Sequence, residues 1–457
     1  MKKHTRFILS CALLAATVGA DAQGLPLSRP MPAEWRYTEG AEQTLPSDDR
    51  WWRRFADPVL DSLINIGENA NFNLAMAYRR MEAADRQMAS ARAAYYPTVD
   101  LNAGYTRERL EGVNSNRWVL GASASWEIDL FGKVTAAVRQ SKAEYKASRA
   151  EWVGAMVSMA GDIASTYVQL RVWQAQLEVA RRHATVQDSI TALVKARYDC
   201  GLAAKPQYAQ AKAQLHSIKA SIPQLETSIV TAVSSLALLT GRYPDEVQSL
   251  LSTPAPLPDY RQVVATGVPS ELLRRRPDIL AAEYQLAAAA AAVGIAKKDF
   301  LPTLSLQGNV GVAAPKIGDM FTERGFTYSV APTLSWTLFD GFARRAGVAA
   351  AREEVEAQIA NYNSTVINAY NEVQNALAQY RNCLHQIDEY RQATADAREF
   401  LYLSLDLYTQ GLSPYSDVAT AQQNLLSYNN SLLVAEGGAL SALVSLYEAL
   451  AGGTDIQ

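Results

Sequence analysis

Two hydrophobic patterns organise this chain, and each predicts a different kind of element. Four segments alternate apolar and polar residues with a period of two, which is typical of β-strands with one apolar face. In the clearest of them, every second residue from Phe326 to Leu338 is apolar, and the residues between are Thr, Ser or Ala. The predicted strands cover residues 98–106, 118–128, 303–312 and 326–338. A transmembrane β-strand needs about ten such residues, so a membrane sheet fits; a half-buried sheet of a soluble protein is the alternative.

The second pattern predicts very long helices. Residues Phe131–Tyr198 contain no Pro and three Gly, and Phe342–Tyr408 repeats this segment. After each comes a Gly turn and a stretch whose apolar residues are spaced by three and four, which indicates coiled-coil packing. We therefore expect two antiparallel helical hairpins, with turns near residues 201 and 411 and a kink at Pro223.

The same elements occur twice in the same order. The segment Tyr95–Leu101 (YYPTVDL) recurs as Phe300–Leu306 (FLPTLSL), and later matches keep nearly the same offset. The sequence thus predicts a mainly helical fold with an internal two-fold repeat. Its predicted parts are a signal peptide (1–22), an N-terminal extended segment (23–57), repeat 1 (58–252), a Pro-rich linker (253–267), repeat 2 (268–453) and a C-terminal tail (454–457).

The N-terminus has the pattern of an export signal. Basic residues between Lys2 and Arg6 precede the apolar stretch Phe7–Ala20, and a small-x-small motif predicts cleavage before Gln23. An uncleaved membrane anchor is one alternative. Lipidation at Cys11 is another, but it would leave a very short apolar segment before the cysteine.

Composition argues against several classes of protein. There are 43 Lys and Arg against 46 Asp and Glu, and a net charge of −3 argues against nucleic-acid binding. Three cysteines are too few for a disulfide scaffold, and four histidines leave little material for a metal site. No uninterrupted apolar run reaches about 18 residues, so no helical membrane span is predicted. No catalytic triad, phosphate loop or Cys–His metal pattern stands out, so we predict no enzyme, cofactor or metal.

The predicted strands require more than one copy of the chain. Four strands cannot close a barrel, and an open sheet edge is not tolerated in lipid. Several protomers must therefore share one barrel, continued by their long helices. The residues between the apolar positions of the strands are small and polar, which suits a water-filled lumen and hence a passive conduit.

Three motifs carry a resemblance to a known family. They are Val268–Glu283 (VPSELLRRRPDILAAE), Trp126–Lys133 (WEIDLFGK) and the turn Tyr198-x-x-Gly201-Leu202 with its copy. In these the chain resembles the TolC-like outer-membrane factors, in the drug-efflux, NodT/OprM-like branch. The resemblance implies a homotrimer in the outer membrane of a Gram-negative-type bacterium. It implies a twelve-stranded β-barrel, four strands from each protomer, continued by a coiled-coil α-helical barrel in the periplasm. A periplasmic adaptor (membrane fusion protein) and an inner-membrane transporter of the RND type are the implied partners.

The resemblance also implies roles for residues near the two turns. Gly201, Leu202, Gly411 and Leu412 would contact the adaptor at the hairpin tips, although a glycine also simply terminates a helix.

Two further residues are implied to form a constriction. Asp417 aligns with an acidic position there, and symmetry copies of one carboxylate would attract cations; a solvated Asp at a helix start is the alternative. Tyr408 matches a gate tyrosine, or only packs. The family's second acidic position is Thr420 here and its basic gate partner is Ser413, so we expect a less charged constriction.

The run Arg274, Arg275, Arg276, Pro277 and Asp278 looks catalytic at first sight. Pro at a helix start followed by Asp is, however, a helix N-terminal signal. We expect the arginines to bond neighbouring carboxylates or carbonyls, so we assign the motif a structural role.

The favoured function is the outer-membrane exit duct of a tripartite efflux system, passively conducting drugs or other small molecules. The exit duct of a type I protein-secretion or metal-efflux system is an alternative with the same fold. A periplasmic coiled-coil adaptor is an alternative from another class, but it has no use for four amphipathic strands. A periplasmic hydrolase lacks a catalytic constellation.

Overall fold

The computed structural model describes residues 31–32, 34–36, 50–252, 255–261, 269–271 and 275–450. The predicted signal peptide, Cys11, Arg274 and the C-terminal tail lie outside the described residues, as does most of the predicted linker.

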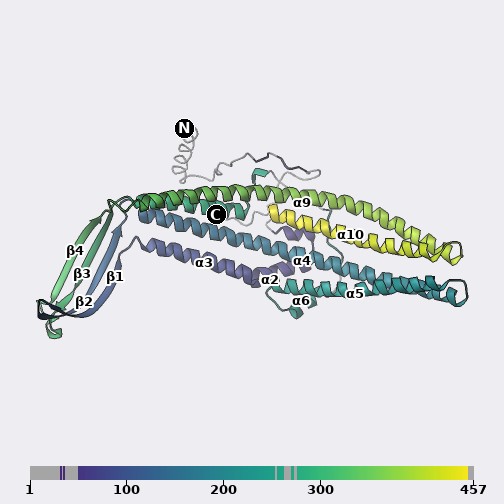
Figure 1. Ribbon diagram of the computed structural model, residues 1–457, viewed down its shortest axis with the longest axis horizontal. Helices are drawn as coiled ribbons and strands as arrows, with labels where there is room; N and C mark the ends of the chain where they lie inside the picture. Colours follow the sequence, from purple (N-terminus) through teal and green to yellow (C-terminus); the bar gives the residue numbers. More distant parts are fainter. Residues whose placement is uncertain are drawn as a thin grey trace. The chain divides into compact units, whose positions relative to one another are not determined.

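The described chain is mostly helical, with four strands (Figure 1). The helices are α2 (Pro58–Ala70), α3 (Phe72–Ala93), α4 (Lys133–Asp199), α5 (Lys205–Leu239), α6 (Pro244–Leu251), α8 (Pro277–Lys298), α9 (Ala343–Thr409) and α10 (Tyr415–Leu450). The strands are β1 (Thr98–Leu110), β2 (Val113–Ile128), β3 (Thr303–Ala314) and β4 (Phe326–Ser335). Short 3-10 helices are η1 (Trp51–Phe55), η2 (Pro269–Glu271) and η3 (Ile317–Asp319). The order helix, strand pair, 67-residue helix, partner helix occurs twice, as the repeat predicts.

The compact units of the fold do not coincide with the two repeats. One unit contains residues 78–151 and 278–365, and therefore the whole sheet. The other contains the described parts of residues 29–77, 152–277 and 366–457, and therefore both hairpin turns. Each unit combines segments of both repeats, because equivalent elements of the two repeats pack together.

The strands form one antiparallel sheet in the order β1-β2-β3-β4, with β1 and β4 at its edges. Apolar side chains stand opposite one another, as in the pairs Leu101↔Ala122 and Trp126↔Leu306. The sheet therefore has one apolar face, on which Leu101 is 78% exposed in the single chain.

The first hairpin is tighter than the sequence predicts. The predicted strands end at residue 106 and resume at residue 118, but β1 and β2 continue to a two-residue turn at Glu111 and Gly112. Both turn residues have positive φ, 48° and 86°, as a type I′ turn requires. The prediction was wrong because Glu is not a usual residue at the first position of this turn. In the other direction, β4 ends at Ser335, three residues before the predicted end.

Each strand pair is fixed to the preceding helix by a tryptophan. The indole N–H of Trp126 donates to the carbonyl of Tyr95 at 3.0 Å, and that of Trp336 donates to the carbonyl of Phe300 at 2.9 Å. The Asp129 carboxylate then accepts two backbone N–H groups from the start of α4. These bonds set the positions where strands give way to the long helices.

The main core of the second unit is rich in aromatic residues from the N-terminal region. Trp51 stacks on Tyr447 of α10 with ring centroids 5.6 Å apart, and Trp35 stacks on Tyr370 of α9 at 5.2 Å. The prediction of an extended segment over 23–57 is therefore wrong in part, because Trp51–Phe55 form η1 and are anchored in this core. The burial of these aromatic side chains anchors Trp35 and Trp51–Phe55 against α9 and α10.

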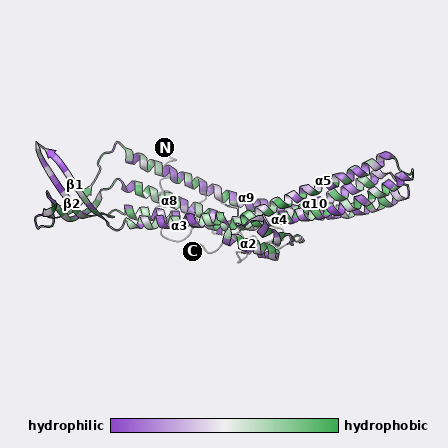
Figure 2. Cartoon of the chain, turned by 90° about the horizontal axis from the view of Figure 1, so that it is seen from below, coloured by the Kyte–Doolittle hydropathy of each residue, from purple (hydrophilic) through white to green (hydrophobic). Residues whose placement is uncertain are grey.

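Three helices are long and apolar enough to cross a membrane by length and composition: α5, α8 and α10. From uninterrupted apolar runs we predicted no helical membrane span. The mean hydropathy does not support that prediction, because an average over a window tolerates isolated polar residues. Figure 2 shows hydrophilic and hydrophobic residues mixed along the long helices. Within α5, Glu226 forms an ion pair with Arg181 of α4, 2.8 Å apart. α5 also remains one helix across Pro223.

Candidate functional site

The two helical hairpins end in turns of the same construction. At the first turn, Gly201 has a φ of 75°, and the Leu202 N–H donates to the carbonyl of Arg197 at 2.8 Å. At the second, Gly411 has a φ of 80°, and the Leu412 N–H donates to the carbonyl of Leu407 at 2.9 Å. This is the Schellman pattern, in which a left-handed residue ends a helix. Glycine is favoured at both turns because residues with a side chain rarely adopt a positive φ.

Each turn presents one leucine to solvent. Leu202 is 69% exposed and Leu412 is 71% exposed. Cys200, beside the first turn, is also exposed and is a free thiol, as is the partly buried Cys383. The tips therefore offer a pair of apolar side chains on rigid turns.

A small core just behind the tips joins the two hairpins. It contains Ile190, Val194, Ala211, Tyr408, Tyr415, Val418 and Ala419. Tyr408 is 3% exposed and meets Tyr415 edge to face, with ring centroids 5.8 Å apart. Residues from α4, α5, α9 and α10 meet here, so the packing around Tyr408 is what holds the two tips side by side.

Arg197 of α4 reaches from the first hairpin to the second. Its guanidinium lies over the Tyr408 ring, 4.9 Å from the centroid, and donates to the carbonyl of Thr409 at 2.8 Å. It thus combines a cation–π contact with a charge-assisted hydrogen bond. Burial raises the pKa of Tyr408, and the nearby Arg197 charge offsets only part of this rise. Sequence reasoning missed Arg197, because only the fold shows that it faces the other hairpin.

Asp417 lies in the first turn of α10 and is exposed. Its backbone N–H donates to the carbonyl of Pro414 at 3.2 Å, and its carboxylate accepts from the Ser416 hydroxyl at 3.3 Å. The carboxylate is thus held locally and remains available to solvent. The Ser413 hydroxyl is buried and has no hydrogen-bond partner in the described part of the chain.

Further from the tips, a buried polar seam joins α4 to α10. The ring nitrogens of His183 lie 3.3 Å from the side-chain amide nitrogens of Gln422 and Asn429. A neutral imidazole donates once and accepts once, so one amide must present its oxygen instead. Among the described residues the buried Gln422 Oε1 has no partner, and turning this amide lets Oε1 accept the Nδ1 proton. Burial, with the nearby Arg182 charge, lowers the pKa of His183, so the ring is neutral at pH 7.

The arginine-rich motif pins the start of α8. Arg276, 9% exposed, donates to the carbonyl of Ala449 at 3.1 Å and pairs with the Glu372 carboxylate at 2.7 Å. Pro277 is the first residue of α8, and the Asp278 carboxylate accepts the N–H of Ile279 at 2.9 Å.

Arg275, the other described arginine of the motif, is half-buried. Arg276 therefore connects α9 and α10 to the segment before α8.

An unusual carboxylate lies beside this motif. Burial, with the neighbouring Asp162 carboxylate, raises the pKa of Glu448 to about 7. The backbone of Gly161 passes so close that a Cβ there would lie 2.6 Å from Glu448 Oε2. Gly161 thus makes room for a carboxyl group that is half protonated near neutral pH.

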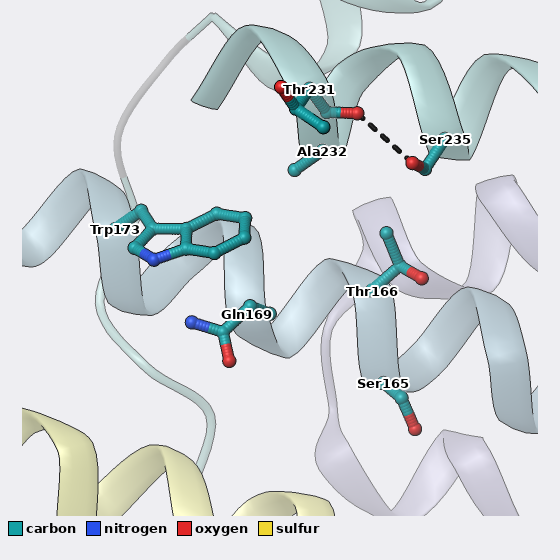
Figure 3. A pocket seen from close by; sticks show the side chains of 7 residues that line it. All are labelled: Ser165, Thr166, Gln169, Trp173, Thr231, Ala232 and Ser235. Carbon is teal, nitrogen blue, oxygen red and sulfur yellow. Dashed lines mark hydrogen bonds between the residues drawn. The ribbon is translucent and has the colours of Figure 1, made fainter. Parts of the chain in front are cut away.

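One small pocket of about 300 Å³ opens between α4 and α5 (Figure 3). Its lining is Ser165, Thr166, Gln169, Trp173, Thr231, Ala232 and Ser235. The Ser235 hydroxyl donates to the carbonyl of Thr231 at 3.0 Å. The lining carries no charged side chain, and the described residues contain no group of three His, Cys, Asp or Glu that could hold a metal ion.

A four-stranded sheet with one apolar face and two open edges, in which each strand pair leads into a long helical hairpin, fits a subunit of an outer-membrane channel. Comparison with known proteins agrees. The sequence profile of the outer membrane efflux protein family matches residues 63–242 and 268–452. The chain belongs to this family.

Two relatives that are named as outer membrane proteins match this chain over nearly their whole length. The chain is 31% identical over 444 residues to the pyoverdine export outer membrane protein OpmQ of Pseudomonas putida, covering 92% of each chain. It is 28% identical to the outer membrane protein OprJ of Pseudomonas aeruginosa, covering 98% of this chain and 96% of the relative.

Among solved structures, the outer-membrane channel OprN superposes with a TM-score of 0.87 at 29% identity, covering 96% of this chain and 99% of OprN. The protein is therefore an outer-membrane efflux channel component of the Gram-negative type, with its helices in the periplasm.

Proposed function

We propose that three copies of this chain assemble into one exit duct. The observation that carries the proposal is the open sheet, whose four strands have an apolar face and two unpaired edges, β1 and β4. Unpaired backbone groups in lipid cost several kcal/mol each, so the edges must pair with other copies. Three copies give a closed barrel of twelve strands, within the size range of outer-membrane barrels.

The duct is proposed to conduct passively. The residues opposite the apolar face of the strands are small and polar, as Ser123, Asn309 and Ser329 illustrate. They suit a water-filled lumen and do not select one ligand. Energy and substrate choice would come from an inner-membrane transporter of the RND type, reached through a periplasmic adaptor. The substrates are drugs or other small molecules, in keeping with relatives named for antibiotic, solvent and pyoverdine export.

The hairpin tips are proposed as the adaptor contact. Gly201 and Gly411 fix the two turns. Leu202 and Leu412 project from these turns and are 69% and 71% exposed. An exposed leucine on a rigid turn loses little conformational freedom when it docks into an apolar groove, so it is a good anchor.

The region just behind the tips is proposed as the constriction. Asp417 is exposed at the start of α10, and three symmetry copies would form a ring of carboxylates that attracts cations. Tyr408 lies behind this ring, and Arg197 ties it to the first hairpin. Opening the duct requires the tips to separate, which breaks the Arg197 contacts.

The motif around Arg275, Arg276, Pro277 and Asp278 is proposed to be structural. Arg276 pairs with the carboxylate of Glu372 on α9 and donates to the Ala449 carbonyl in the last turn of α10. It would therefore hold α9 and α10 together at this level while the tips move.

Planar-bilayer recording of the detergent-purified protein tests the proposal. We expect a small, cation-preferring conductance that flickers, as a duct narrowed at its helical end should show. A protein that never inserts into the bilayer, or a steady wide pore indifferent to the tip residues, would contradict it.

A further inference from the structure

One end of the sheet carries charges that the proposed duct does not use. β1 and β2 continue past the aromatic pair Tyr105 and Trp118, whose ring centroids lie 4.4 Å apart, to the turn at Glu111 and Gly112. α4 follows the other end of β2, so this turn lies at the end of the sheet away from α4. Since the helices are periplasmic, the turn lies at the outer surface of the membrane.

Aromatic residues on the apolar face mark the depth of the membrane. Trp126 lies near the helical end of β2 and Trp118 lies eight residues away, toward the turn. Eight residues span about 27 Å along a strand, and a strand tilt of about 40° reduces this to roughly 20 Å of depth. This is close to the apolar band of outer-membrane barrels, about 25 Å. Residues between Trp118 and the turn therefore lie among the headgroups of the outer leaflet.

The strand register places two arginines on the lipid-facing side at this level. Side chains of β1 alternate between the two faces, so Arg107 and Arg109 lie on the same face as Leu101. Asn116 stands opposite Arg107, and Asn114 stands opposite Arg109. The apolar face thus continues beyond its aromatic residues as a patch of guanidinium and amide groups.

The charges of the β1–β2 hairpin are sorted by face. Glu108 lies on the polar face with Arg117, and Glu111 lies in the turn. Arg107 and Arg109 are exposed, and their side chains form no ion pair or hydrogen bond within the described ranges of the chain. They stand two residues apart on one strand, about 7 Å, so an anion that lies between them relieves their repulsion.

Asn116 adds a third hydrogen-bond donor to the two arginines. The Tyr105 hydroxyl donates to Oδ1 of Asn116 at 3.1 Å, which leaves the NH2 group of this amide to donate elsewhere. Directly opposite residues of an antiparallel pair have Cβ atoms about 4.5–5.5 Å apart, so this amide lies beside Arg107. The patch therefore offers N–H donors and positive charge together, and phosphate oxygens are acceptors with negative charge.

We infer that Arg107, Arg109 and Asn116 bind a phosphate group of the phosphorylated glycolipids in the outer leaflet of the membrane. A guanidinium group matches phosphate with two parallel hydrogen bonds. The occupant is a lipid because the patch directly continues the apolar face: acyl chains contact the residues below Tyr105, and the headgroup contacts the arginines. The inference rests on the proposed duct, in which this face of the sheet meets lipid.

Lipid binding to the detergent-purified protein tests the site. The probe is lipid A with two phosphate groups, titrated and counted by native mass spectrometry. Arg107→Gln, alone and with Arg109→Gln, removes the charges. Arg117→Gln is the matched control, because it removes one charge at the same level from the polar face. Replacing both arginines by lysine keeps the charges but loses the paired donors.

Two further probes identify the source of the phosphate. Inorganic phosphate at millimolar concentration is the competitor that carries no acyl chains. Phosphatidylethanolamine carries acyl chains but no net charge. We expect lipid A to bind more tightly than phosphatidylethanolamine and to remain bound in inorganic phosphate. Full displacement by inorganic phosphate would overturn the lipid as the occupant.

The variants give the expected magnitudes. A basic residue near an anionic lipid surface changes affinity about fivefold, so Arg107→Gln should weaken lipid A binding about fivefold and the double glutamine variant roughly 25-fold. Arg117→Gln should change it less than about twofold, and the double lysine variant should lie between the wild type and the double glutamine variant. An equal loss in Arg107→Gln and Arg117→Gln, or no loss in the double variant, would overturn the site.

Planar-bilayer conductance of the same samples separates this inference from the proposed duct. A double glutamine variant that conducts like the wild type and binds lipid A equally well refutes the lipid site alone. A wild-type protein that never inserts into the bilayer refutes the duct, and with it the lipid-facing side on which the site depends.

Discussion

Replacing Arg197 by alanine should loosen the closed end of the duct. Arg197 adds two contacts between the hairpins to the apolar packing around Tyr408: its hydrogen bond to the Thr409 carbonyl and its cation–π contact with the Tyr408 ring. The substitution removes both contacts and leaves the Thr409 carbonyl to water. Because Arg197 is partly exposed, we take the lower values for each contact.

A hydrogen bond to a charged group contributes about 1.5 kcal/mol and an exposed cation–π contact about 0.5 kcal/mol. The sum, about 2 kcal/mol for each subunit, corresponds to roughly a 30-fold shift toward the open tip. Arg197→Lys keeps the charge but loses the guanidinium that lies over the Tyr408 ring, so it should lie between the wild type and the alanine variant.

The assay is single-channel recording, comparing open probability and conductance for the two Arg197 variants and for Arg182→Ala. Arg182 is an exposed arginine on the same helix that pairs with Glu178 at 3.5 Å, so its removal controls for lost surface charge. If Arg197→Ala opens no more often than Arg182→Ala, the latch role of Arg197 is refuted.

Three further predictions concern other parts of the chain. The pKa of Glu448 is about 7 in the folded protein and about 4.5 in the unfolded chain, so the free energy of unfolding should fall as pH rises between these values. Glu448→Gln should abolish this fall and should be more stable than the wild type at pH 8, by up to about 3 kcal/mol in thermal unfolding. Equal pH dependence of the two proteins would disprove this prediction. Gly437→Ala would place a Cβ 2.4 Å from a methyl group of Val172 on α4, and should lower the free energy of unfolding by about 1–3 kcal/mol. In Gly294→Ala the added Cβ meets nothing within 4 Å in the single chain, so this control variant should be neutral or stabilising. Similar melting temperatures for the two variants would contradict the prediction. Asp417→Ala should reduce cation selectivity in bilayers and Asp406→Ala should not; unchanged selectivity in the first removes Asp417 from the constriction.

The strands and long helices could be predicted from the sequence because their signals are strong. Alternation over about ten residues, and 67-residue segments nearly free of Gly and Pro, leave few competing structures. The repeat also predicted the equivalence of the two halves, which the matching registers of β1–β2 and β3–β4 display. The end of β4 was predicted from the alternation of apolar and polar residues alone. This alternation carries no information on whether a neighbouring strand pairs there.

The misses have physical causes. The aromatic anchor Trp51–Phe55 follows a stretch rich in polar residues in the sequence, and its burial depends on contacts with α10 nearly 400 residues later. Arg197 and His183 gain their partners only when the hairpins lie side by side, so no local pattern marks them. The roles proposed for Asp417 and the exposed leucines depend on an assembly of several chains, and a single chain displays only the exposure of these side chains.

The most direct test of the central claim is the mass of the detergent-purified protein by light scattering, corrected for bound detergent. A channel built from open four-stranded sheets predicts a particle of three chains that requires detergent to stay in solution. A single chain that is soluble without detergent would contradict the shared barrel, because its sheet edges would then be stable in water without a partner.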